Sequence, residues 1–539
     1  MNDATHEVTN QPPEMPDYDA WSRDAWLRAC AGRWGATGIE PAAQALGRFA
    51  GSAEAREHAR LANRHAPELR THDPAGHRID QVEYHPSYHV LMARAIGSGV
   101  HSRAWKQGTG GFAQRAVLFY IWNQLEQGTA CPVTMTFASI PVFTHAPALE
   151  REWRPKVLAD AYDPRPLPLA AKPGATIGMA MTEKQGGSDL RAVSTAARAD
   201  GEAWRLTGHK WFCSAPMSDG FFTLARGPGG VSCYFVPRTL ADGTRNPFLI
   251  QRLKDKAGNR SNASAEIEYR DTWATAVGEP GRGIATLIEM SHHTRFDIVV
   301  GVAGMMRSAL DHALHHARHR SAFGRHLVDH ALMRNVLADL ALETQAALLL
   351  AFRLAAAFDA SGTSPTERGL QRVLTPVAKY WACKRMTPVA VEAMECLGGN
   401  GYVEESPLAR LFREAPLNGI WEGSANVICL DVLRALERSP EGLEALAAEV
   451  EGAGEPRAVS SLDRARALLA DRDRAESRAR EIVECLALAA QGALMKRHSE
   501  GSSAEAFCAS RLEARGAHGL GTLTAGIDAA AIVRRASFE

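Results

Sequence analysis

The spacing of hydrophobic positions changes twice along this chain, and the changes divide it into helical and strand-forming regions. From about residue 21 to residue 167, apolar residues recur every three or four positions, as in 42–61 and 114–126, which predicts helices. Between residues 179 and 281 they fall in short aromatic and β-branched runs separated by glycine turns, which predicts antiparallel strands. We expect these strands at residues 204–212, 220–226, 231–237 and 264–269.

Helical spacing returns after residue 281 and predicts a bundle with helices at 284–317, 332–358, 370–397 and 425–437. Proline and glycine at 439–442 and 451–456 then interrupt the pattern before a helical tail. The sequence thus predicts an α+β fold. Its expected domains are a helical N-terminal domain at 1–178, a β domain at 179–281, a helical bundle at 282–438 and a helical extension at 439–539.

Charge and cysteine content limit the possible function classes. The 539 residues include 61 Lys and Arg against 61 Asp and Glu, so nucleic-acid binding would need a local basic patch. Nine cysteines without a C-x-x-C pair fit a reducing compartment. The first twenty residues lack a secretory signal pattern, and polar residues interrupt the apolar run at 340–358. A cytoplasmic protein without a membrane span is therefore expected.

Two glycine- and hydroxyl-containing segments of the β domain could contact a ligand. In M-A-M-T-E-K-Q-G-G-S-D at 179–189, adjacent glycines allow close backbone approach, while Thr182 and Ser188 offer hydroxyl donors. In G-H-K-W-F-C-S at 208–214, Phe212 could lie against a flat ring whose edge Ser214 bonds. Taken alone, each segment is also compatible with ordinary loop or core chemistry. No G-x-G-x-x-G follows a strand, so nicotinamide binding by that route is not supported.

A third segment, I-W-E-G-S-A-N-V at 420–427, places one carboxylate at the start of a predicted helix. Ser424 is at the position of a helix cap, and Glu422 comes just before it, between Trp421 and Gly423. A lone glutamate is usually a solvated surface residue. One fixed at a buried turn beside an aromatic ring is a candidate general base.

Together these segments resemble the acyl-CoA dehydrogenase family over roughly residues 60–435. The resemblance adds R-x-x-F-G at 320–324 and G-G-N-G-Y at 398–402, in the family's order and approximate spacing. The Lys-Trp-Phe-Cys-Ser variant and the C-terminal extension make the sequence most similar to the AidB branch, the alkylation-response members of the family.

The resemblance implies a homotetramer with FAD held between the β domain and the bundle. Glu422 would be the catalytic base that removes the proton α to a thioester carbonyl. The family's flavin contacts fall on Met181, Thr182, Gly187, Ser188, Phe212, Cys213, Ser214, Trp421, Gly423, Ser424 and Asn426, with Arg320 and Phe323 reaching the cofactor of a partner subunit. His315, His316 and His319 follow one another on a predicted helix but lack carboxylate or cysteine partners at ligand spacing, so no metal site is expected.

The AidB resemblance also implies that the extension binds double-stranded DNA in the response to alkylation damage. From residue 441 to 539 there are 13 basic and 16 acidic residues, so bulk charge does not show this. The interleaved charges at 464–480 are typical of a solvated helix. The less compensated candidates are Arg434, Arg438, Lys496, Arg497, Arg511 and Arg515. The alternative is a short- or branched-chain acyl-CoA dehydrogenase whose extension is only structural.

Overall fold

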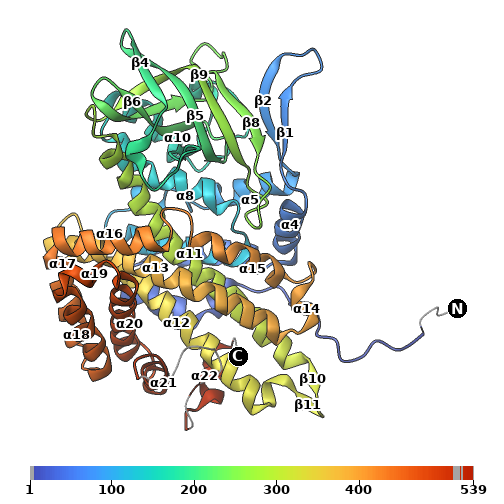
Figure 1. Ribbon diagram of the computed structural model, residues 1–539. Coiled ribbons are helices and arrows are strands. Elements are labelled where there is room, and N and C mark those ends of the chain that lie inside the picture. Colours follow the sequence, from blue (N-terminus) through green and yellow to red (C-terminus); the bar gives the residue numbers. More distant parts are fainter. Residues whose placement is uncertain (1–4, 514–522, 524–525, 538–539) are drawn as a thin grey trace. The chain divides into compact units, whose positions relative to one another are not determined.

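The computed structural model describes residues 5–513, 523 and 526–537. Two compact units form within the chain (Figure 1). The first, which we call the sheet unit, contains residues 35–50 and 54–297; the second, the bundle unit, contains residues 1–34, 51–53 and 298–539. This division is coarser than the four segments expected from the sequence. The C-terminal extension belongs to the same unit as the bundle, and most of the expected N-terminal domain belongs to the same unit as the β domain, while residues 1–34 belong to the bundle unit.

The N-terminal part of the sheet unit is mostly helical. Its helices are α3 (Glu40–Ala50), α4 (Ala53–Arg64), α5 (Pro86–Gly97), α6 (Arg103–Lys106), α7 (Gly111–Leu125), α8 (Ala130–Ala138), α9 (Ile140–Phe143) and α10 (Pro147–Val157). The expectation of helices alone is wrong at one place, where β1 (Glu68–His72) and β2 (Arg78–Glu83) form an antiparallel hairpin. Because β1 alternates only between exposed and half-buried positions, it shows no strong apolar period.

A seven-stranded sheet forms the rest of this unit. The four expected strands are confirmed as β5 (Ala203–Ser214), β6 (Gly220–Gly227), β7 (Gly230–Pro237) and β9 (Ser264–Val277). The sequence analysis missed β3 (Ile177–Ala180), β4 (Ala196–Asp200) and β8 (Phe248–Leu253). The strand order is β3-β6-β4-β5-β9-β7, with β6 also paired to β7 and β8 to β9. The sheet is not purely antiparallel, since β3 pairs with β6 in parallel.

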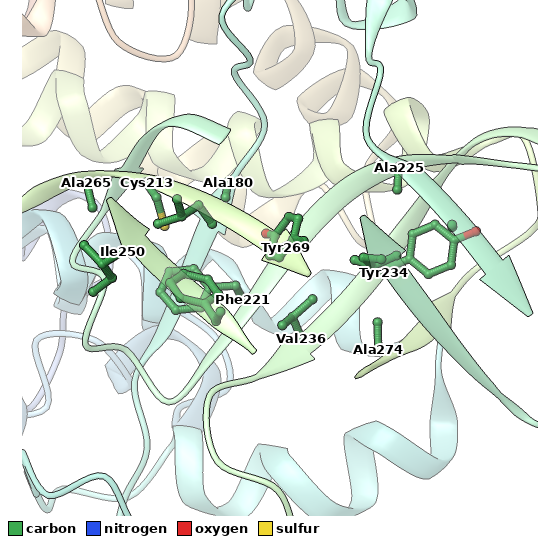
Figure 2. Packing of buried hydrophobic residues seen from close by; sticks show 14 of the residues in the cluster. Ala180, Cys213, Phe221, Ala225, Tyr234, Val236, Ile250, Ala265, Tyr269 and Ala274 are labelled. Carbon is green, nitrogen blue, oxygen red and sulfur yellow. The ribbon is translucent and has the colours of Figure 1, made fainter. Parts of the chain in front are cut away.

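Aromatic and small side chains fill the inside of this sheet (Figure 2). Phe221 and Phe248 are fully buried and their rings stack with centroids 4.9 Å apart. Tyr269 packs beside them from β9. This close-packed interior fixes the two segments, at the ends of β3 and β5, that carry the family motifs.

The four expected helices of the bundle are confirmed as α11 (Gly283–His319), α12 (Ala331–Ala360), α13 (Pro365–Cys396) and α16 (Ala425–Arg438). The part of α11 up to residue 297 belongs to the sheet unit. The bundle unit also contains α1 (Ala20–Arg23), α2 (Ala25–Arg33), the short strands β10 (Ser321–Ala322) and β11 (Arg325–His326), α14 (Gly399–Tyr402) and α15 (Pro407–Asn418). Among the described residues, α12 alone is long and apolar enough to cross a membrane, and 94% of its most apolar window is buried within the protein.

The extension is helical and packs on the bundle. It contains α17 (Pro440–Glu451), α18 (Pro456–Ala470), α19 (Arg472–Ala475), α20 (Ala479–His498), α21 (Gly501–Arg511) and α22 (Ala529–Ala536). Arg353 of α12 bonds Glu367 of α13 and Glu449 of α17. The indole N–H of Trp381 in α13 donates to Gln491 of α20 over 2.8 Å. The extension is therefore attached to the bundle by specific polar contacts.

Candidate active site

The loop after β3 presents hydroxyl groups on a backbone that needs glycine. Met181 and Thr182 are half-buried and Ser188 is exposed. A Cβ atom on Gly187 would lie 2.5 Å from the Thr182 hydroxyl oxygen, which is closer than side chains can pack. The small residue at 187 thus keeps the Thr182 hydroxyl in place.

A buried ion pair holds this loop against β5. Lys210 and Glu183 are 0% and 1% exposed, and Nζ lies 2.8 Å from Oε1. The same carboxylate accepts hydrogen bonds from the backbone N–H and hydroxyl groups of Ser194 and Thr195. Burial acts to raise the pKa of Glu183, but Lys210 and these donors outweigh it and hold that pKa well below its usual value. Both ends of the loop are therefore tied to one ionised side chain.

The end of β5 brings its candidate residues directly to the β3 loop. The N–H of Trp211 donates to the Thr182 carbonyl over 2.8 Å, at a point where the β5–β9 register shifts. Phe212 is 49% exposed, while Lys254 Nζ lies 4.8 Å from its ring centroid. Ser214 shares a hydrogen bond with Ser264. Phe212 can therefore cover a flat ligand beside the Thr182 hydroxyl.

The prediction for Cys213 needs a correction. Its side chain is 0% exposed and lies in the interior of the sheet (Figure 2). Successive side chains of a strand point to opposite faces, so an outward Phe212 places Cys213 inward. Only the backbone of Cys213 can meet a ligand outside the sheet.

In the bundle unit, Glu422 lies on the loop between α15 and α16. Its φ angle is +58° and that of Gly423 is +106°, so two successive residues adopt positive φ. A non-glycine residue in this region is strained unless its surroundings fix it. The Glu422 side chain is half-buried and its Oε2 atom is shielded from solvent. A carboxylate so placed has restricted freedom, and one of its two oxygen atoms is shielded from water.

A buried lysine supports this turn from α13. Lys379 is 1% exposed, and its Nζ donates to the Gly423 carbonyl over 2.7 Å. The sequence analysis missed Lys379 because the lysine lies between apolar residues on a helix, outside every recognised motif. The only signal was a charged side chain on an otherwise apolar face.

The other residues of this loop are donors or small groups. Trp421 Nε1 is buried and has no acceptor within the part of the chain that the structure describes. Ser424 is the N-cap residue of α16, but its hydroxyl makes no capping hydrogen bond, contrary to the capping role expected from the sequence. Asn426 is exposed and accepts a hydrogen bond from Arg480 of α20. The Trp421 indole and the Ser424 hydroxyl thus remain able to bind a ligand.

Arg320 and Phe323 lie elsewhere in the bundle unit, at the β10–β11 turn. Arg320 donates to the backbone carbonyl of Asn10 over 2.6 Å. Phe323 is 97% exposed and adopts a positive φ of 51°. Figure 1 shows this turn well away from α16. The structure therefore does not bring Arg320 and Phe323 to the Glu422 loop of the same chain.

The candidate DNA contacts fall into two classes. Arg434, Arg438, Lys496 and Arg497 are exposed, on α16 and at the end of α20. Arg511 is 3% exposed and is bound by Asp339 and by Glu343, at 3.0 Å, so the expectation that it contacts phosphate needs correction. Arg515 lies outside the described residues.

Three family profiles match the chain. The N-terminal domain of the adaptive response protein AidB matches residues 10–164, the acyl-CoA dehydrogenase middle domain residues 178–272, and the acyl-CoA dehydrogenase C-terminal domain residues 281–437. These matches follow one another along the chain in the order expected from the motifs.

Individual relatives match over nearly the whole chain. AidB of Escherichia coli K12 is 43% identical over 523 residues, which are 96% of either protein. Acyl-CoA dehydrogenase family member 11 of Caenorhabditis elegans is 31% identical over 73% of this chain and 66% of its own length. The crystal structure of Caenorhabditis elegans ACDH-11 in complex with C11-CoA superposes with a TM-score of 0.86 and 26% identity, covering 94% of each chain.

Proposed function

The chain belongs to the acyl-CoA dehydrogenase family, in its AidB branch, and on this premise we propose that it is an FAD-dependent oxidoreductase acting on an acyl-CoA thioester. The observation that carries the proposal is the Glu422 turn, where one carboxylate is held at positive φ beside a buried lysine. An acyl-CoA ligand is supported by the C11-CoA present in the structure of Caenorhabditis elegans ACDH-11.

FAD is the cofactor of this family, and the groups in each unit suit it. The sheet unit offers the Thr182 and Ser188 hydroxyls on a glycine-dependent loop, and Phe212 for a ring face. The bundle unit offers the indole N–H of Trp421. Such donors match the carbonyl and phosphate oxygens of a flavin dinucleotide. A bound FAD would supply the redox chemistry, as the acceptor for the hydride that leaves the β carbon of the substrate.

The protein's own part is to position and move a proton. The Glu422 carboxylate takes the proton from the carbon α to the thioester carbonyl. This proton is far less acidic than a carboxylic acid, so the base must be shielded from water and fixed in direction. Burial of Oε2 and the turn held by Lys379 supply these two conditions.

The test is an anaerobic titration of the purified FAD-loaded protein with acyl-CoA of several chain lengths. Wild-type protein should lose its visible flavin absorbance. Glu422→Gln should bind FAD equally well but bleach about 10²–10⁴-fold more slowly, because general base catalysis typically contributes that factor. Glu437→Gln, at an exposed position on the neighbouring helix α16, is the matched control. Equal bleaching by Glu422→Gln and wild type would reject the base assignment.

A second function, binding of double-stranded DNA in the response to alkylation damage, is supported by the AidB relationship and by exposed cations. Arg434 and Arg438 lie four residues apart on α16 and are both exposed, so they share one face of that helix. No recognition helix motif is present, so we expect contacts with phosphates and tolerance of sequence.

Salt dependence distinguishes this function from a merely structural extension. Reversing Arg434 and Arg438 to glutamate should weaken DNA binding and reduce the slope of log K against log salt by about 2, since each phosphate contact contributes about 0.9. The control reverses Arg472 and Arg474, which lie among acidic residues. An unchanged slope in the Arg434/Arg438 variant would show that this face of α16 does not contact DNA. A wild-type protein without DNA affinity would favour a structural role for the extension.

We also propose that the protein is a homotetramer in which one copy presents Arg320 and Phe323 to the flavin of another. The nearly full exposure of the Phe323 ring and its position away from Glu422 support this arrangement.

A further inference from the structure

One residue of the extension touches the first turn of α16, the helix that directly follows the loop with the candidate base. Arg480 lies in the first turn of α20, and its Nε donates to Oδ1 of Asn426 over 2.8 Å. Helix α20 is held against the bundle by the hydrogen bond between Trp381 and Gln491. The side chain of Arg480 thus reaches residues 421–426 from a fixed helix, although it comes from a part of the chain outside the acyl-CoA dehydrogenase profiles.

The chemistry of the two groups fixes which way the amide faces. A guanidinium has only donors, so the amide of Asn426 must present its oxygen to Arg480. Its NH₂ group is then directed away from Arg480 and is available to an acceptor on a ligand. Without Arg480, the amide could rotate and present its oxygen instead, which would repel a phosphate or carbonyl oxygen.

The charge of Arg480 also acts on the start of α16. Burial raises the pKa of Cys429 to about 11, and the positive charge of Arg480 opposes this rise. At the other side of the loop, Lys379 of the bundle holds the Gly423 carbonyl. Two cations, one from the bundle and one from the extension, therefore bind the Gly423 carbonyl before α16 and the Asn426 amide in its first turn.

We propose that Arg480 is a positioning residue of the flavin site, which orients the Asn426 amide so that its NH₂ group donates to an acceptor oxygen of the cofactor. Through this bond the extension takes part in holding the flavin, whatever else it binds. The inference rests on the proposed function, because it concerns the same FAD site.

The test measures flavin release and the flavin spectrum rather than turnover. Arg480→Ala should release FAD about tenfold faster on dilution, followed by the fluorescence of the freed flavin, and should shift the visible absorption band. Arg480→Lys, which retains a donor and the charge, should restore most of the retention. Asn426→Asp keeps an acceptor for Arg480 but removes the NH₂ donors, so it should release FAD at least as fast as Arg480→Ala. The control is Arg472→Ala, at an exposed position on the preceding helix α19.

A double-mutant cycle separates positioning from general loss of structure. In an Asn426→Ala background, Arg480→Ala should cause no further loss of flavin, because its effect acts through the amide. Thermal unfolding of the flavin-free variants should match that of the flavin-free wild type.

The proposal is overturned if Arg480→Ala retains flavin as well as Arg472→Ala does. It is also overturned if the effects of Arg480→Ala and Asn426→Ala on flavin release add in the double variant. Should Arg480→Ala fail to fold, Asn426→Ala and Asn426→Asp test the same amide, and normal flavin retention in both would overturn the proposal. A wild-type protein that does not bind FAD would instead refute the proposed function.

Discussion

At the scale of single residues, the buried Glu183–Lys210 pair is the contact on which the β3 loop depends. Lys210 Nζ bonds both Glu183 and the Leu224 carbonyl, and both charged side chains are buried. Removing one member of such a pair leaves an uncompensated charge, whereas replacing both can cost little. The sequence placed both residues within family motifs but gave no role to either, because their partnership depends on strands distant in the sequence.

This pair gives a prediction about stability. Glu183→Gln should lower the free energy of unfolding of the sheet unit by about 3–5 kcal/mol. The double variant Glu183→Gln/Lys210→Met should lose less of this free energy than Glu183→Gln alone. As the control, Glu202→Gln at an exposed position should change the free energy of unfolding little. Because the pKa of Glu183 is lowered by folding, its stabilising effect is present above its unfolded pKa and is lost as pH falls through its folded pKa. Urea unfolding should therefore show a difference between wild type and Glu183→Gln that narrows in strong acid, where the Glu183 carboxylate is protonated, and a difference that persists undiminished there would contradict the ion-pair assignment.

At the scale of elements, the sequence predicted those whose apolar period is strong and missed those decided by distant pairing. The helices of the bundle and strands β5, β6, β7 and β9 are confirmed. Strand β3 is short, and its parallel pairing with β6 joins residues over forty positions apart. The hairpin of β1 and β2 has few buried positions. Local hydrophobic spacing therefore reveals neither the β3–β6 pairing nor the β1–β2 hairpin.

Helix α21 of the extension illustrates the same point. The four-residue spacing of Arg511 and Arg515 predicted one exposed cationic face, but α12 covers Arg511 with two carboxylates. Burial acts to lower the pKa of Arg511, and Glu343 and Asp339 outweigh it and raise that pKa. Arg511 is thus a structural contact between the extension and the bundle.

Arg511→Met should accordingly act on folding rather than on DNA. We expect a loss of about 3–5 kcal/mol in the free energy of unfolding of the bundle unit, because Asp339 and Glu343 would remain buried without this cation. Arg497→Met, at an exposed position near the end of α20, should change stability by less than about 0.5 kcal/mol. If Arg511→Met were fully stable and reduced the slope of log K for DNA binding against log salt, this account would be wrong and Arg511 would contact DNA.

At the scale of the whole molecule, family motifs predicted which segments hold the candidate chemistry but not what supports them. The five motifs gave the family and the order of its domains, as the matching profiles confirm. They could not reveal Lys379 or Arg480, since each contacts the segment 421–426 from another helix. The sequence also gave no reason to expect that the extension and the bundle form one unit.

The central claim is that this chain holds FAD with Glu422 directed at a substrate carbon, and one measurement tests it most directly. The purified protein, stripped of any flavin, is titrated with FAD and then with acyl-CoA under anaerobic conditions while its visible absorbance is followed. We predict stoichiometric flavin binding followed by bleaching that depends on Glu422. A protein that stays colourless after reconstitution, or a bound flavin that no acyl-CoA reduces, would contradict the account.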